Sequence, residues 1–123
     1  MPIVLSAFIA EDSAVIREGL IGALEELAPI EVVGTAEDEQ SAVNWLADHH
    51  CDVVVVDVFL KSGSGLGILR FARTLRRDMK CVVLTNYATP QMRGKCLELG
   101  AARVFDKSSE IEELIIYCEQ LSA

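Results

Sequence analysis

Short apolar segments alternate along the chain with segments in which apolar residues recur at helical spacing. Several apolar segments show no alternation with polar residues, which is typical of strands covered on both faces in a parallel sheet. The helical segments that separate and follow them each carry one apolar stripe. The pattern predicts an α/β fold of five parallel strands and five helices, in one domain spanning residues 1–123. The expected strands are residues 3–9, 30–33, 53–58, 81–84 and 102–105.

Residues that favour helix starts support the predicted boundaries. Asp12 and Ser13 can cap the first helix, and Thr89 lies just ahead of the fourth. Ser108 or Ser109 precedes an acidic first turn of the fifth helix. Hydroxyl and carboxylate side chains at these places accept hydrogen bonds from free N–H groups, so each helix has a defined beginning.

Composition narrows the class of protein. A chain of 123 residues, 51% of them hydrophobic, is long enough for one buried core. Its apolar runs fall far short of the roughly 20 residues that cross a membrane, and its start lacks a secretory signal, so a cytoplasmic protein is expected. The net charge of -8 disfavours direct binding to nucleic acid. Four dispersed cysteines without metal-ligand spacing predict buried thiols.

Polar residues follow four of the predicted strands. They are Glu11 with Asp12, Asp57 after four valines, Thr85, and Lys107. In an open parallel sheet these strand ends meet at one crevice. Neighbouring carboxylates require a cation, and oxygen ligands suit Mg²⁺. Asp57 can then act as a nucleophile toward phosphorus, while Lys107 and Thr85 bind phosphoryl oxygens, so the sequence predicts an acyl-phosphate pocket.

Four motifs in matching order resemble the receiver domain of bacterial two-component response regulators, over essentially the whole chain. They lie in residues 9–13, 53–57, 82–86 and 99–101 with 105–107. The resemblance implies a doubly wound, flavodoxin-like fold with strand order 2-1-3-4-5. It also implies a phosphoacceptor switch rather than an enzyme. A sensor histidine kinase or phosphotransfer protein would supply the phosphoryl group, and an output protein or a self-dimer would receive the signal.

The resemblance also implies a role for each site residue. Asp57 would be the phosphorylated aspartate. Asp12 and Asp57 would bind Mg²⁺ directly, Glu11 would act through a water, and the main-chain carbonyl of Phe59 would complete the protein ligands. Thr85 and the lysine after the fifth strand would keep the phosphoryl-binding roles given above.

The sequence departs from the family pattern at several positions. Val104 stands where the family carries an aromatic switch residue, so Tyr87 is our hypothesis for part of the gating. Ser108 replaces a common proline, which predicts a trans peptide bond before it. The glycines and serines of residues 61–65 indicate a flexible rim. Phe59 and Tyr87 place two rings beside the pocket, which predicts that the phosphoryl group is lost slowly, over minutes or longer.

Two other functions stay open from the sequence alone. A phosphatase with an aspartate nucleophile also uses Mg²⁺, but it normally carries a second acid where this chain has Phe59. A binding module that keeps the fold without the phosphorylation switch is compatible with Val104. Ile116, which lies off the apolar stripe of the last helix, is a candidate for a partner or dimer surface.

Overall fold

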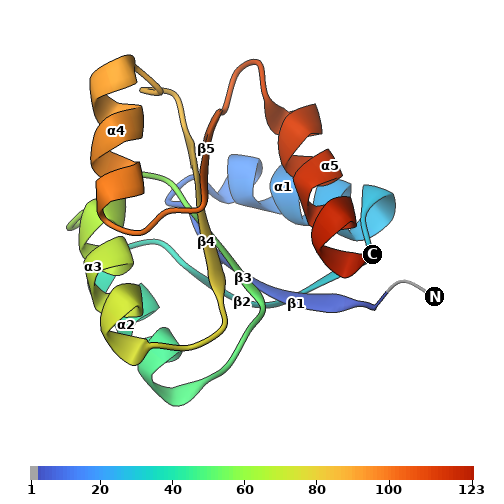
Figure 1. The fold of residues 1–123 in the computed structure, drawn as a ribbon, viewed down its shortest axis with the longest axis horizontal. Coiled ribbons are helices and arrows are strands. Elements are labelled where there is room, and N and C mark those ends of the chain that lie inside the picture. The colour runs from blue at the N-terminus through green and yellow to red at the C-terminus, as the bar shows by residue number, and fades with distance from the viewer. Residues whose placement is uncertain (1–2) are drawn as a thin grey trace.

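The computed structural model describes residues 3–123, in which strands and helices alternate along the chain (Figure 1). All strand pairs are parallel and the sheet order is β2-β1-β3-β4-β5, which confirms the predicted α/β fold. In chain order the elements are β1 (Leu5–Ala10), α1 (Ala14–Leu27), β2 (Ile30–Ala36), α2 (Glu39–Asp48), β3 (Val53–Val56), α3 (Gly65–Leu75), β4 (Lys80–Thr85), α4 (Pro90–Glu98), β5 (Arg103–Asp106) and α5 (Ile111–Ser122).

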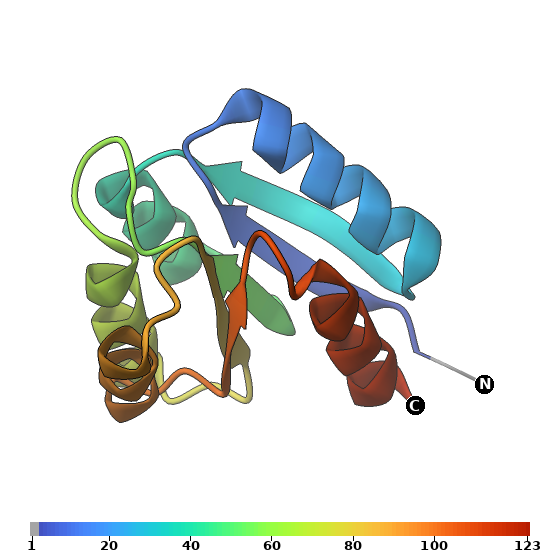
Figure 2. The ribbon, with the colours of Figure 1, turned by 90° about the horizontal axis from the view of Figure 1, so that it is seen from above.

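Helices cover both faces of the sheet, so the molecule has three layers (Figure 2). Helices α1 and α5 lie on one face, and α2, α3 and α4 lie on the other. The four valines of β3 show why this strand is apolar throughout. Val53 and Val55 point into the core beneath α1 and α5, while Val54 and Val56 point into the core on the opposite face. Successive side chains of a strand face opposite ways, so burial on both faces requires an unbroken apolar run.

All five strands differ from the sequence expectation by one to three residues at one or both ends, and the cap of helix α5 differs as well. Strand β1 begins at Leu5 instead of residue 3, because the Ile3 N–H donates to the Ser122 carbonyl of α5. Helix α5 takes Glu110 as its N-cap, without a side-chain capping bond. The predicted cap Ser108 instead donates its N–H and hydroxyl to the Asp106 carboxylate. The carboxylate at the end of β5 is a strong acceptor and holds this serine two residues before the N-cap Glu110.

The four cysteines are free and buried, as predicted. Burial raises the pKa of Cys51 to about 12 and that of Cys81 and Cys118 to about 11, so these thiols stay protonated at neutral pH. They act as core residues. From residue 3 onward, none of the helices is both long enough and apolar enough to span a membrane.

Candidate functional site

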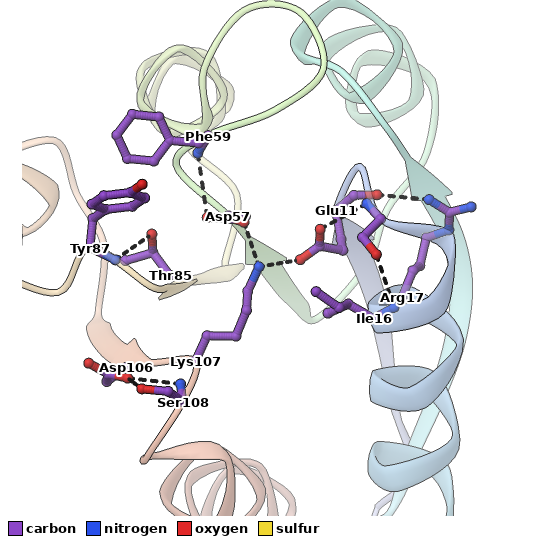
Figure 3. Close-up of polar contacts among 11 residues, drawn as sticks. Glu11, Ile16, Arg17, Asp57, Phe59, Thr85, Tyr87, Asp106, Lys107 and Ser108 are labelled. Atoms are coloured by element: carbon purple, nitrogen blue, oxygen red, sulfur yellow. Dashed lines mark hydrogen bonds and ion pairs between the residues drawn. The ribbon is translucent and has the colours of Figure 1, made fainter.

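The site lies at the carboxyl ends of β1, β3, β4 and β5 (Figure 3). Asp57 follows β3 directly, and its N–H donates to the Ala10 carbonyl of β1 at 3.0 Å. Glu11 follows β1 and is 3% exposed, while Asp57 is 9% exposed. Two carboxylates are therefore buried side by side, which is stable only if a cation or hydrogen-bond donor lies between them.

Lys107 supplies that cation. Its Nζ lies 2.5 Å from Glu11 Oε1 and 2.6 Å from Asp57 Oδ2, and its side chain is 9% exposed (Figure 3). Burial acts to lower the pKa of Lys107, but the hydrogen bonds and charges of Asp57 and Glu11 outweigh it, so its pKa lies above the ordinary value. The lysine is charged at neutral pH and joins the ends of three strands.

Asp12 lies outside this ion cluster. Its side chain is exposed, whereas that of its neighbour Glu11 is buried. In residues 3–123 there is no group of three or more His, Cys, Asp or Glu side chains close enough to hold a metal ion. Two carboxylates facing one ammonium still leave one negative charge uncompensated. The donor set, carboxylate oxygens beside the main chain of Phe59, fits a hard divalent cation.

Thr85 ends β4 with its side chain fully buried. Its hydroxyl accepts a hydrogen bond from the Tyr87 N–H at 3.3 Å, and its carbonyl accepts one from the Lys107 N–H at 2.9 Å. The threonine thus lies between the lysine and the loop that follows β4. Its hydroxyl faces the same side of the sheet edge as Asp57 in Figure 3.

Two aromatic rings lie together on one side of Asp57. The rings of Phe59 and Tyr87 lie 4.5 Å apart between centroids, tilted by 58° (Figure 3). Phe59 is 51% exposed and Tyr87 is 57% exposed. The Phe59 N–H donates to Asp57 Oδ1 at 3.4 Å. The tilted pair forms an apolar wall on one side of the carboxylate, with a geometry that aromatic pairs favour.

Val104 and Phe105 lie on opposite faces of β5. Val104 is buried in the core on the face covered by α2, α3 and α4, and Phe105 is buried in the core on the other face, as expected for neighbouring strand residues. Arg93 of α4 reaches this strand: its guanidinium donates to the Val104 carbonyl at 2.9 Å and to the Glu110 carboxylate at 2.7 Å. Sequence reasoning missed Arg93, because nothing in the sequence around an arginine on a helix shows that it binds a main-chain carbonyl of a neighbouring strand.

The peptide bond before Ser108 is trans, as predicted, since residues 3–123 contain no cis peptide. Asp106 orders the turn: its carboxylate accepts from the N–H and hydroxyl of Ser108, and its carbonyl accepts from the Glu110 N–H. The hydrogen bonds from Ser108 hold the pKa of Asp106 below its usual value. This turn carries Lys107 on its first residue and so fixes where the lysine leaves the strand.

Comparison with known proteins gives a consistent match. A family model described as the response regulator receiver domain matches residues 7–119. Response regulator UvrY of Escherichia coli K12 is 27% identical over 111 residues, covering 90% of this chain and 51% of the relative. The chain thus spans about half the length of the curated relatives it matches.

Solved structures match over almost the whole chain. A LuxR-family DNA-binding response regulator from Staphylococcus aureus superimposes with a TM-score of 0.88 at 20% identity, covering 97% of this chain and 99% of that one. A response regulator from Burkholderia pseudomallei, with a phosphorylated aspartic acid, a calcium ion and citrate, superimposes with a TM-score of 0.81 at 20% identity. It covers 95% of this chain and 68% of that one. At these identities the structures establish the shared fold.

Proposed function

This chain belongs to the response regulator receiver domain family of two-component signalling, and from that membership we propose that Asp57 is its phosphoacceptor. The observation that carries the proposal is the ion cluster: Asp57 is buried at a strand end, with Lys107 on one of its oxygens. A carboxylate held beside a fixed positive charge is suited to attack phosphorus, because the lysine offsets the charge of the incoming phosphoryl group.

In the proposed transfer, a carboxylate oxygen of Asp57 forms a bond to phosphorus as the bond between phosphorus and the donor breaks. Lys107 and the Thr85 hydroxyl would bind phosphoryl oxygens. The phosphodonor would be a sensor histidine kinase or a phosphotransfer protein. The chain would therefore act as a switch that phosphorylation of Asp57 turns on and hydrolysis of the acyl phosphate turns off.

Receiver domains generally use Mg²⁺, and the oxygen donors here fit that ion. The side chains of Asp12 and Asp57 and the main-chain carbonyl of Phe59 would hold it, with Glu11 acting through a water. When bound, the ion supplies a second positive charge for the phosphoryl oxygens. The residues of this chain position the acceptor: Lys107 and the buried strand ends fix the Asp57 carboxylate before a donor arrives.

Phosphorylation by acetyl phosphate tests the proposal. Incubation with acetyl phosphate and Mg²⁺ should add the mass of one phosphoryl group to the intact protein, and Asp57→Asn should abolish the addition, because an amide oxygen is a poor nucleophile. Intact-protein mass spectrometry reads both results. Asp52→Asn is a matched control, since Asp52 lies at the opposite end of β3 and bonds to Ser6. A phosphoryl group that persists in Asp57→Asn would reject the assignment.

The aromatic pair gives a prediction about lifetime. We expect the phosphorylated chain to lose its phosphoryl group over minutes or longer, because the rings of Phe59 and Tyr87 restrict the approach of water to Asp57. The Phe59→Ala/Tyr87→Ala double variant should shorten the lifetime about tenfold, a difference of about 1.4 kcal/mol in the barrier. Loss of phosphate measured over time provides the test. A wild-type lifetime of seconds contradicts the shielding.

The signal would pass to an output protein or a second copy of the chain. Ile116 is 51% exposed on α5, in agreement with its place off the core stripe. It remains our candidate for part of the output surface. In other family members an aromatic residue at the position of Val104 fills the gating role. Tyr87 remains our candidate for part of that role here, since the Tyr87 N–H donates to the Thr85 hydroxyl.

A further inference from the structure

The loop that joins β3 to α3, residues 58–64, folds back on itself directly after Asp57. Phe59 and Ser64 pair as an isolated antiparallel bridge. The Ser64 hydroxyl also donates to the Val58 carbonyl at 3.2 Å. The Gly65 N–H donates to the same Val58 carbonyl at 2.9 Å. Phe59, the next residue after Val58, carries the main-chain carbonyl proposed above as a metal ligand, so a loop held at Ser64 also holds the backbone that carries this carbonyl.

Glu39, the first residue of α2, contacts this loop from the neighbouring helix. Its Oε1 accepts from the Ser64 N–H at 2.9 Å, and its own N–H donates to the Ser62 carbonyl at 3.0 Å. The neighbouring Glu37 carbonyl accepts from the Lys61 N–H at 3.3 Å. Three main-chain groups of the loop are therefore bound to one segment. These hydrogen bonds act against the flexibility that the sequence predicts for residues 61–65.

Two glycines make room for the Glu39 side chain. A Cβ at Gly63 would lie 2.5 Å from Glu39 Cβ, and a Cβ at Gly67 would lie 2.3 Å from Glu39 Oε2. Gly63 also has φ +76, a conformation that favours glycine. The carboxylate thus lies against the first turn of α3, where free N–H groups favour a negative charge. Shape and charge both select an acidic side chain of this length.

We propose that Glu39 is a positioning residue for the phosphoacceptor site: its carboxylate fixes Ser64, and through the Phe59–Ser64 bridge it fixes the main-chain carbonyl of Phe59. The inference rests on the proposed function and adds to it a residue outside the pocket. A hydrogen bond to a charged acceptor is stronger than one to a neutral acceptor. The bond from the Ser64 N–H to the Glu39 carboxylate is therefore the strongest of the three hydrogen bonds described above between this loop and residues 37–39. Glu39 acts on metal affinity by ordering a ligand, without touching the metal.

Glu39→Ala tests the proposal through Mg²⁺ binding in the absence of a phosphodonor. Its Mg²⁺ dissociation constant, measured by calorimetry, should rise about tenfold, the range found when groups that orient a ligand are removed. Hydrogen exchange at the Ser64 amide should accelerate by a similar factor. Glu39→Gln keeps an acceptor oxygen but loses the negative charge, so both quantities should fall between those of the wild type and Glu39→Ala. Gln40→Ala removes only a hydrogen bond to Asn44, one turn further along α2, and should change neither quantity.

Gly67→Ala separates positioning from stability. Alanine favours a helix over glycine, so α3 itself is stabilised by the change. The new methyl group displaces the Glu39 carboxylate, the flexible end of its side chain. We expect weaker Mg²⁺ binding, as in Glu39→Ala, in a protein that unfolds at or above the wild-type temperature.

Acetyl phosphate kinetics complete the test. Glu39→Ala should be phosphorylated more slowly at limiting Mg²⁺ and at the wild-type rate at saturating Mg²⁺, because only the affinity for the ion changes. A wild-type Mg²⁺ dissociation constant in Glu39→Ala would overturn the inference and leave the proposed function intact. Failure of the wild-type chain to bind Mg²⁺ or accept a phosphoryl group would overturn the proposed function and this inference with it.

Discussion

Replacement of Lys107 by methionine is expected to lower the free energy of unfolding by about 3 kcal/mol in metal-free buffer. The methionine keeps the length of the side chain but removes the positive charge that contacts both Glu11 and Asp57. Two buried carboxylates then face each other with no positive charge between them, which is the costly case for a buried ion cluster. Urea denaturation of both proteins at neutral pH measures the difference.

Magnesium and pH supply further readouts for Lys107→Met. Added Mg²⁺ should stabilise the variant more than the wild type, because binding to the folded state adds stability and the variant offers an unpaired carboxylate pair. The pKa of Lys107 is raised by folding, so its contribution is present at neutral pH and is lost as pH rises above the ordinary lysine range. Wild-type stability should therefore decline more steeply above about pH 10 than that of the variant.

Lys61→Met is the matched control. Lys61 is 71% exposed and lies 3.8 Å from the Glu37 carboxylate, an arrangement in which an ion pair contributes less than about 1 kcal/mol. It should change the free energy of unfolding by about 0.5 kcal/mol or less. An equally small effect for Lys107→Met would show that the cluster does not carry the stability assigned to it.

The sheet was predictable because a strand that is buried on both faces appears in the sequence as an unbroken apolar run. The valine run before Asp57 is typical of a parallel strand that is covered on both faces. The carboxyl ends of the parallel strands then bring Asp57, Thr85 and Lys107 to one edge of the sheet. The sequence does not show which way each side chain at the site points. It gave no sign that Glu11 is buried on the lysine while Asp12 is exposed, since adjacent acids look alike in a sequence.

Contacts between loops were also beyond the sequence. Glu39 and Gly67 are 28 positions apart, and only the packing of α2 against α3 places a carboxylate where a Cβ would be. Arg93 likewise joins α4 to β5 by donating to the main-chain carbonyl of Val104. Any residue type at position 104 would present the same carbonyl. Main-chain acceptors are the same for every residue type, so a side chain that binds them leaves no matching partner to find in the sequence.

Gly65→Ala is expected to lower the free energy of unfolding by about 2–3 kcal/mol, because the added methyl group has no space. A Cβ there would lie 2.1 Å from the Asp57 carbonyl oxygen and 3.0 Å from Val58 Cα, both main-chain atoms that cannot rotate away. The start of α3 must move, and the hydrogen bond from the Gly65 N–H to the Val58 carbonyl weakens. Thermal and urea unfolding measure the loss.

The same displacement reaches the acceptor, because the carbonyl that the methyl group pushes belongs to Asp57 itself. Phosphorylation by acetyl phosphate should therefore slow as stability falls. Gly94→Ala is the control of opposite sign: a Cβ at this position on α4 would meet nothing within 4 Å. Alanine at an open helical position should raise the free energy of unfolding by about 0.5–1 kcal/mol and leave phosphorylation unchanged. If both alanines stabilise the chain, the close approach of α3 to Asp57 is not a constraint on this fold.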